Sequence, residues 1–261
     1  MTASPRFVQT GSQSVVAVIP ARYGSQRLPG KPLADICGKP MIQHVYERTA
    51  QAGSIDWCLV ATDDERIASV VREFGGHAVV TPDTLQTGTD RVAFVARSLP
   101  EAAILVNVQA DEPLLQPTMI DEAVRPLVAD PRVSVATLVR HIDDEQDLTN
   151  RGIVKVVLDR DSNCLYFSRS PIPCARDAAP GSWTKRHLYF KHIGLYVYRR
   201  EFLLELLEMS RTPLEITESL EQLRIVEHGH RIKAAITEHD SIPVDTAEDL
   251  ERVRSILSKR T

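Results

Sequence analysis

The sequence predicts an α/β fold built on a mainly parallel β-sheet that is covered by helices. Short apolar runs alternate with amphipathic, helix-like segments over the first half of the 261-residue chain. The apolar runs are nearly continuous, which is typical of parallel strands buried on both faces. Parallel strands need crossover connections, and the helix-like segments between the runs supply them.

The expected elements of the first half follow from these runs and from helix start and stop signals. Thr62 or Asp63 is a candidate N-cap for the second helix, which would end at Gly75-Gly76. Strands are predicted at residues 15–19, 57–61, 78–80, 103–108 and 133–139. Helices are predicted between them at residues 41–52, 65–74, 90–99 and 117–128.

The second half of the chain predicts antiparallel pairing. Residues 153–158 and 164–167 flank a polar turn at residues 159–163, and a loop containing proline and glycine covers about 171–185. Further strands are predicted at residues 192–198 and 232–236, and further helices at residues 201–209, 217–227 and 247–257. No internal repeat or low-complexity linker is visible, so we expect a polar tail over residues 1–14 and one domain over residues 15–261.

Composition narrows the class of protein. The formal net charge of −4 excludes nucleic-acid binding by bulk electrostatics. The four cysteines form no C-x-x-C pair, which favours reduced thiols over a disulfide framework or a zinc site. Residues 1–14 lack the apolar stretch of a secretory signal, and no apolar run reaches the length of a membrane span. We therefore expect a cytoplasmic protein with no nucleic-acid partner and no membrane insertion.

The loop after the first predicted strand is a candidate phosphate site. The strand ends at Pro20, and the polar, glycine-containing loop that follows carries Arg22, Arg27 and Lys31. Such a loop presents backbone N–H groups and positive charge to a phosphate. It is not a Walker A loop, because Pro32 stands where that motif needs Ser or Thr. The alternative is a basic surface loop.

Polar clusters follow several predicted strands and would meet at one edge of the sheet. Ligands of open α/β sheets bind outside the carboxyl ends of the strands, so a shared edge indicates a single site. The clusters are Pro20-Ala21-Arg22, Thr62-Asp63-Asp64 and Gln109-Ala110-Asp111-Glu112-Pro113.

Asp111 and Asp245 are candidate metal ligands. Both follow short apolar segments, and carboxylate oxygens of this kind hold Mg²⁺ that also bridges substrate phosphates. Ordinary structural roles are also open: Asp111 could cap a turn, and Asp245 could belong to the helix start formed with Thr246 and Asp249.

Two further segments carry polar side chains at regular spacing. In Thr87-Gly88-Thr89-Asp90-Arg91 the hydroxyls could contact a base or a phosphate, or Thr89 could cap the next helix. Alternation places His192, Gly194, Tyr196 and Tyr198 on one face of their strand, as a ligand face or as a half-exposed aromatic face. Glu218, Glu221 and Gln222 lie away from the apolar stripe of their predicted helix, as a solvated face or as groups that bind a polyol.

Motifs along nearly the whole chain point to one family. They are Pro20-Ala21-Arg22-Tyr23-Gly24-Ser25-Gln26-Arg27-Leu28-Pro29-Gly30-Lys31-Pro32-Leu33, Gly38-Lys39-Pro40-Met41-Ile42, Ala61-Thr62-Asp63, Thr87-Gly88-Thr89-Asp90-Arg91, Asn107-Val108-Gln109-Ala110-Asp111-Glu112-Pro113, Tyr166-Phe167-Ser168-Arg169, His192-Ile193-Gly194-Leu195-Tyr196, Pro213-Leu214-Glu215, Leu220-Glu221-Gln222-Leu223-Arg224 and Val244-Asp245-Thr246. In order and spacing they resemble the 3-deoxy-manno-octulosonate cytidylyltransferases, also called CMP-Kdo synthetases. The first motif alone would indicate only the wider sugar nucleotidyltransferase group.

The resemblance implies a Rossmann-like fold with a smaller α+β region over about residues 150–200 that serves dimerisation and sugar binding, and a homodimer. It implies transfer of CMP from CTP to a 3-deoxy sugar acid with release of pyrophosphate, and Mg²⁺ held by Asp111 and Asp245. Arg22 and Lys31 would bind the triphosphate and, with the two aspartates, form the catalytic set. The implied nucleotide contacts are Pro20, Ala21, Arg22, Lys31, Thr62, Asp63, Thr87, Gly88 and Thr89. The implied sugar contacts are Gln109, Arg169, His192, Tyr196, Glu221 and Gln222.

The sequence departs from the family pattern at three positions. Leu85 stands where bacterial members usually have His, Ala110 where they have Gly, and Gln26 where they have Thr. Ala110 would be strained if that backbone needed a positive φ. A related acid, 8-amino-Kdo or a sialate-like acid, is therefore a second candidate substrate. Two different classes of protein are also open: a glycosyltransferase that uses Asp159 and Asp161 as its D-x-D, and a catalytically inactive nucleotide-binding regulator.

Overall fold

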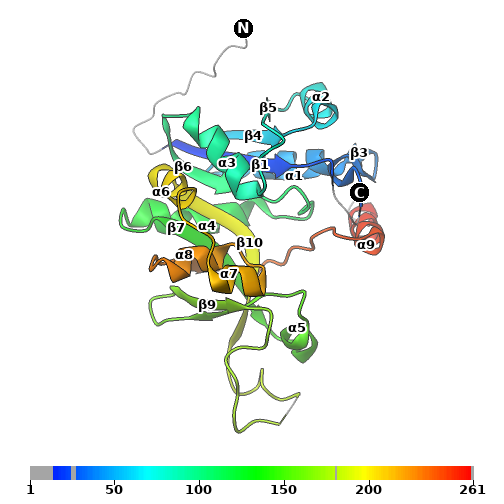
Figure 1. Ribbon diagram of the computed structural model, residues 1–261. Helices are drawn as coiled ribbons and strands as arrows, with labels where there is room; N and C mark the ends of the chain where they lie inside the picture. Colours follow the sequence, from blue (N-terminus) through cyan, green and yellow to red (C-terminus); the bar gives the residue numbers. More distant parts are fainter. Residues whose placement is uncertain (1–13, 25–27, 180, 260–261) are drawn as a thin grey trace.

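The computed structural model describes residues 14–24, 28–179 and 181–259, and the helices and strands named below lie in these ranges (Figure 1). The larger sheet contains β1 Ser14–Ala21, β4 Trp57–Thr62, β5 Ala78–Val80, β6 Ala102–Asn107, β7 Val135–Ile142, β8 Lys155–Leu158, β9 Cys164–Ser168, β10 Tyr189–Arg199 and β11 Lys233–Ile236. A small ladder pairs β2 Asp35–Ile36 with β3 Lys39–Pro40. The helices are the 3₁₀ turn η1 Lys31–Leu33 and α1 Met41–Ala50, α2 Glu65–Glu73, α3 Gly88–Arg97, α4 Pro117–Ala129, α5 Glu145–Thr149, α6 Arg200–Leu206, α7 Pro213–Glu218, α8 Gln222–Glu227 and α9 Ala247–Ser258.

The main path of the larger sheet runs β11-β7-β10-β6-β1-β4-β5, with β8 and β9 joined to one side of β10. Its strands are parallel except β10, which runs antiparallel to both β6 and β7. The prediction of a mainly parallel α/β sheet is confirmed. Because β10 pairs Tyr196 with Asn107, the last residue of β6, the part of β10 that precedes Tyr196 extends past the carboxyl end of β6.

Helices cover both faces of the sheet, and their apolar sides form two large cores. On one face Ile42 of α1 and Ile120 of α4 pack with the side chains of β1, β4 and β6 that point that way. On the other face Val92 of α3 and Phe202 of α6 pack against the alternate residues of the same strands. Each fully buried side chain of this size contributes about 1.5–3 kcal/mol to the free energy of unfolding. Both faces of β1 are thus buried, which is why its sequence is continuously apolar.

The predicted helix at residues 217–227 is wrong, because two short helices stand in its place. α7 begins earlier, at Pro213, and ends before Ser219, whose φ of 52° and ψ of 51° are left-handed. α8 then begins at Gln222. The apolar stripe expected for one continuous helix is broken, and Ile216 is exposed.

Two helix caps also differ from prediction. The N-cap of α2 is Asp64, whose carboxylate accepts from the backbone N–H of Arg66, and not Thr62 or Asp63. The N-cap of α3 is Thr87, not Thr89, because α3 begins at Gly88. The remaining predicted strands and helices are found with bounds shifted by a few residues, and Ser14 begins β1 instead of ending a tail.

The predicted hairpin at residues 153–167 is present as β8 and β9. The Asp159 carboxylate accepts from the backbone N–H of Asp161 at 2.8 Å and of Asn163 at 2.7 Å. Asp159 therefore holds its own turn, which argues against a glycosyltransferase metal site at this D-x-D.

None of the helices in the described ranges has the length and apolar character needed to cross a membrane.

Candidate active site

The turn after β1 brings Lys31 back over the end of that strand. Gly30 has a φ of 69°, and its N–H donates to the Tyr23 carbonyl at 3.0 Å. A Cβ on Gly30 would lie 3.2 Å from the Tyr23 ring, so both the backbone conformation and the close approach require glycine. Arg27 lies outside the described residues and is not placed.

Lys31 lies between the two predicted metal ligands. Its Nζ is 2.7 Å from Asp111 Oδ2 and 3.2 Å from Asp245 Oδ1. Burial by itself would lower the pKa of Lys31, but the two carboxylates outweigh it and raise that pKa. A backbone hydrogen bond of 2.9 Å from Val244 N–H to the Asp111 carbonyl holds the two segments together. Asp245 precedes the N-cap of α9, which is Thr246, so capping does not account for its carboxylate.

This arrangement fits a shared cation. The carboxylate oxygens of Asp111 and Asp245 both contact the Lys31 ammonium, so both are directed at one cation position. Mg²⁺ binds through one or two carboxylates and completes its shell with water and substrate phosphates. The described part of the chain contains no cluster of three or more His, Cys, Asp or Glu side chains suited to a metal. Asp111 and Asp245 therefore suit a metal that arrives with phosphate better than one held by protein alone.

Two cavities open beside these residues. The first, which we call the β1-loop cavity, has a volume of about 260 Å³. It is lined by Pro20, Arg22, Gly24, Lys31, Pro32, Gly88, Arg91, Gln109, Ala110 and Asp111. Three cations and one carboxylate face it, so its charge suits a polyanion.

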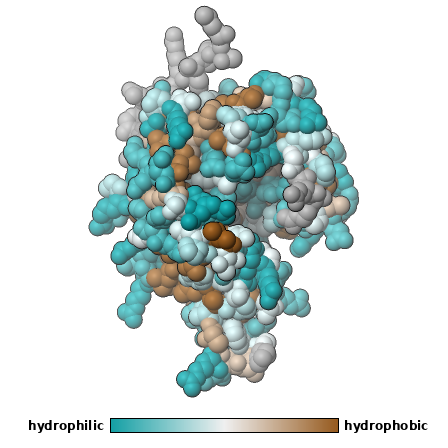
Figure 2. Space-filling view, in the orientation of Figure 1, coloured by the Kyte–Doolittle hydropathy of each residue, from teal (hydrophilic) through white to brown (hydrophobic). Residues whose placement is uncertain are grey.

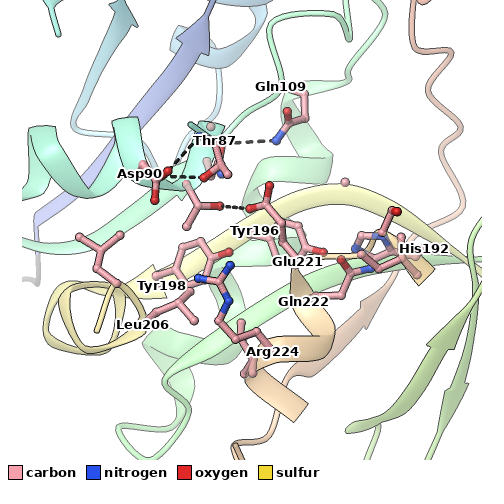
Figure 3. Close-up of a pocket in the computed structure, with 18 residues that line it drawn as sticks. Thr87, Asp90, Gln109, His192, Tyr196, Tyr198, Leu206, Glu221, Gln222 and Arg224 are labelled. Atoms are coloured by element: carbon pink, nitrogen blue, oxygen red, sulfur yellow. Dashed lines mark hydrogen bonds between the residues drawn. The ribbon is translucent and has the colours of Figure 1, made fainter. Parts of the chain in front are cut away.

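The second, the β10 cavity, has a volume of about 270 Å³ and lies between β10, the N-terminus of α3 and the α7–α8 connection (Figure 3). It is lined by Thr87, Gly88, Thr89, Asp90, Asn107, Gln109, His192, Gly194, Tyr196, Tyr198, Leu206, Leu207, Ser219, Leu220, Glu221, Gln222, Arg224 and Ile225. The surface on this side of the molecule is mostly hydrophilic and is hollowed near its middle (Figure 2).

Gly88 and Gln109 line both cavities and mark where they meet. Gly88 is the first residue of α3, and a Cβ there would lie 3.2 Å from the Pro20 ring. Thr87 and Asp90 form a capping box, in which each side chain accepts from the other residue's backbone N–H. The positive end of the α3 dipole is therefore held at the junction of the two cavities.

The floor of the β10 cavity is polar but neutral. Thr137 Oγ1 donates to the Leu195 carbonyl at 2.8 Å, so the His192 Nε2–H donates to that hydroxyl at 2.9 Å. Burial lowers the pKa of His192 to about 3 and raises the pKa of Tyr196 well above its usual value. The predicted common face of His192, Tyr196 and Tyr198 is confirmed. Neutral donors and acceptors of this kind suit the hydroxyl groups of a sugar.

Glu221 and Gln222 form part of the opposite wall. Thr89 Oγ1 donates to Glu221 Oε2 at 3.0 Å, which connects α3 to the α7–α8 connection. Burial raises the pKa of Glu221 above its usual value. Gln222 is 6% exposed. Of the two interpretations offered for this segment, the solvated face is wrong for Gln222, whereas Glu221 lines the cavity and is also exposed.

Arg169 does not line either cavity. Its Nε donates to the Glu218 carbonyl at 2.9 Å, and its backbone N–H donates to the Glu218 carboxylate at 3.0 Å. Arg169 therefore contacts the residue that precedes Ser219 and supports the cavity wall from outside. Ala21 and Thr62 are buried and also lie outside both linings.

Arg91 is a site residue to which the sequence pattern assigned no role. It lines the β1-loop cavity, yet no part of it is exposed to solvent. Its guanidinium donates to Asp63 and Thr81, and burial lowers its pKa although Asp63 acts in the opposite direction. Asp63 thus holds Arg91 and does not face either cavity. A signal was present in the sequence, since the i, i+4 spacing of Arg91 and Val95 places both on the buried side of α3.

Two of the three departures have a structural explanation. At position 85, Arg22 donates to the backbone carbonyl of Leu85, and this contact does not depend on which side chain stands there. Ala110 is absent from the residues with positive φ, so its methyl group costs no backbone strain. Gln26 lies outside the described residues.

Comparison with known proteins identifies the family. A family model described as cytidylyltransferase matches residues 16–232. A 3-deoxy-manno-octulosonate cytidylyltransferase from Geobacter metallireducens is 53% identical over 254 residues, which cover 94% of this chain and 98% of that protein. The chain belongs to the 3-deoxy-manno-octulosonate cytidylyltransferase family.

Other members of this family agree in length and in fold. The protein of the same name from Geotalea uraniireducens is 52% identical over 254 residues, covering 94% of this chain and 99% of that one. A solved CMP:2-keto-3-deoxy-manno-octonic acid synthetase in complex with CTP superimposes with a TM-score of 0.89 at 42% identity, covering 95% of this chain and 100% of that one. The resemblance, the Rossmann-like fold and the nucleotidyltransferase class are confirmed.

Proposed function

We propose that the protein transfers CMP from CTP to 3-deoxy-D-manno-octulosonate (Kdo), giving CMP-Kdo and pyrophosphate for lipopolysaccharide biosynthesis. The observation that carries the proposal is the meeting of two unlike cavities at Gly88 and Gln109. A cationic cavity beside a hydroxyl-rich one with a neutral floor suits a polyphosphate and a sugar that react where the two join. The names of the relatives supply the two substrates.

On the nucleotide side, Arg22 and Lys31 bind the triphosphate, and the N-terminus of α3 adds backbone donors. The other residues assigned to the nucleotide either contact it or position a neighbouring side chain that does. They are Pro20, Ala21, Thr62, Asp63, Thr87, Gly88 and Thr89. Asp63 acts through Arg91, which it fixes at the cavity wall. Asp111 and Asp245 would hold Mg²⁺, which would supply neutralisation of phosphate charge and a more acidic attacking hydroxyl.

On the sugar side, Gln109, His192, Tyr196, Glu221 and Gln222 contact the sugar acid. Their neutral amide, imidazole and phenol groups exchange hydrogen bonds with hydroxyls, and Glu221 accepts from them. Arg169 acts through the connection that it supports and does not contact the sugar.

The reaction is an in-line displacement at the α-phosphorus. The anomeric hydroxyl oxygen of the sugar forms a bond to phosphorus, the bond to the β-phosphate oxygen breaks, and the hydroxyl proton passes to solvent. Positioning and charge neutralisation supply the acceleration, because no covalent nucleophile is needed. Arg22 and Lys31 offset the charge that develops on the leaving pyrophosphate.

The test measures pyrophosphate release with CTP, Mg²⁺ and a panel of Kdo, an 8-amino analogue and a sialate-like acid. Turnover with Kdo at the highest kcat/KM supports the proposal. Turnover confined to another acid of the panel would assign that acid as substrate, and no turnover with any acid would favour a catalytically inactive regulator.

We also propose a cytoplasmic homodimer. The four cysteines all lie in the described ranges as free thiols, which suits a reducing compartment. Leu165 and Leu188, in the region of residues 150–200, are 54% and 66% exposed, and a partner subunit would cover such side chains. A monomeric mass by light scattering at micromolar concentration would contradict the dimer.

A further inference from the structure

The wall of the β10 cavity that carries Glu221 and Gln222 is an irregular segment. α7 ends at Glu218, Ser219 adopts a left-handed conformation, and α8 begins at Gln222. We call residues 219–222 the elbow. All four of its residues line the β10 cavity, on the side facing β10 and the N-terminus of α3 (Figure 3). The shape of the elbow therefore decides where two predicted sugar contacts point.

One residue, Glu215, holds the elbow from both ends. Its carboxylate accepts from Arg224 Nε at 2.9 Å and from Arg224 Nη2 at 2.6 Å, a bidentate pair. Its backbone carbonyl accepts from Leu220 N–H at 3.1 Å and from the N–H of Ser219. Glu215 thus connects the first turn of α7 to the elbow through its carbonyl and to α8 through its side chain.

The ion pair is buried, which makes its loss costly. The Glu215 side chain is 2% exposed and that of Arg224 is 15% exposed. The hydrogen bonds from Arg224 lower the pKa of Glu215 in spite of its burial, so the carboxylate stays charged. Removing one partner of such a pair leaves a buried charge without compensation. Arg211 also contacts Glu215, at 3.3 Å, but its side chain is 66% exposed and lies outside the elbow.

We infer that Glu215 and Arg224 are positioning residues that set the affinity for the sugar acid by fixing the elbow. This inference rests on the proposed function, which assigns the β10 cavity to the sugar. Glu215 contacts neither cavity, so it acts through Arg224 and the elbow. We expect this pair to affect nucleotide affinity far less, because the β1-loop cavity contains no residue of the elbow and the elbow reaches the proposed nucleotide contacts only through the Thr89–Glu221 hydrogen bond.

The test is a double-mutant cycle with Glu215→Gln, Arg224→Gln and the variant that carries both, measured as KM for the sugar acid and KM for CTP. We expect each single change to raise KM for the sugar acid roughly tenfold. We expect the double variant to be no worse than either single one, and KM for CTP to stay within about twofold. Arg211→Gln is the matched control, since it removes an exposed partner of the same carboxylate.

A direct contact between Arg224 and the sugar gives a different result. Arg224→Gln would then raise KM for the sugar acid while Glu215→Gln left it unchanged, and this outcome overturns the inference. Equal loss of affinity for both substrates also overturns it. If the Gln variants fail to fold, Arg224→Lys decides, because it keeps the charge and loses the bidentate geometry. An intermediate rise in KM for the sugar acid supports the inference, and an unchanged KM overturns it. Failure of the proposed function is seen separately, as absence of turnover by the unmodified protein.

Discussion

The backbone N–H of Val244 donates a 2.9 Å hydrogen bond to the carbonyl oxygen of Asp111. This bond joins the segment after β6 to the segment before α9, which are far apart in the sequence. It places Asp245 beside Asp111, with Lys31 in contact with both carboxylates. The site is therefore assembled from three separate parts of the chain.

Asp111→Ala and Asp245→Ala are expected to lower kcat/KM by more than roughly 100-fold each, because each removes half of the protein's donor set for Mg²⁺. Pyrophosphate release measured over a titration of Mg²⁺ checks this, and circular dichroism checks the fold. Glu248→Gln is the control, since Glu248 is an exposed carboxylate near Asp245. Near-normal activity in either aspartate variant would show that the metal assignment is wrong.

Lys31→Ala is expected to raise KM for CTP roughly tenfold and to raise KM for the sugar acid by less. Lys31 lines the β1-loop cavity, and its two carboxylate partners, Asp111 and Asp245, are not among the residues that line the β10 cavity. Steady-state kinetics with each substrate varied in turn provides the measurement. The opposite order of effects would place the triphosphate elsewhere.

Gly88→Ala is expected to lower kcat at least roughly tenfold with little loss of stability. The new Cβ would lie 3.2 Å from the Pro20 ring, at the junction where the two substrates must meet. Gly53→Ala is the matched control, because its Cβ would meet its nearest neighbour at an ordinary 3.8 Å. Equal kcat values for the two variants would contradict the role of the junction.

His192 is expected to make stability depend on pH in the acidic range. Its pKa is about 3 in the folded protein and near 6.5 in the unfolded chain. The unfolded state therefore binds the proton first, so the free energy of unfolding falls as pH drops below about 6.5, by at most about 1.4 kcal/mol per pH unit. Denaturant unfolding at pH 7 and pH 5 should show a smaller drop for His192→Gln than for the unmodified protein. Equal drops would mean that His192 is not held neutral.

Most of the regular structure followed from the sequence because its signals are local. The apolar run of β1 and the helix signals around α4 depend only on neighbouring residues. The break at Ser219 did not follow, because a serine gives no local signal for a left-handed conformation. That conformation is held by Glu215, which also pairs with Arg224 on the next helix.

The site residues divide in the same way. The periodicity of the sequence predicted that Asp111 follows the end of a strand and that His192 lies on the polar face of another strand. The pairing of Asp63 with Arg91 could not be predicted. Asp63 and Asp64 both follow β4, and only the packing of α3 against the sheet brings Arg91 to Asp63.

The sequence by itself determined the fold class, the edge of the sheet that carries the site and the family. The tertiary structure alone decided which groups meet: Lys31 with Asp245, Thr89 with Glu221, and Arg169 with Glu218 instead of the cavity. The physical reason is that secondary structure depends on short-range periodicity and backbone preference. Contacts between distant residues depend on how the packed elements bring them into hydrogen-bonding distance.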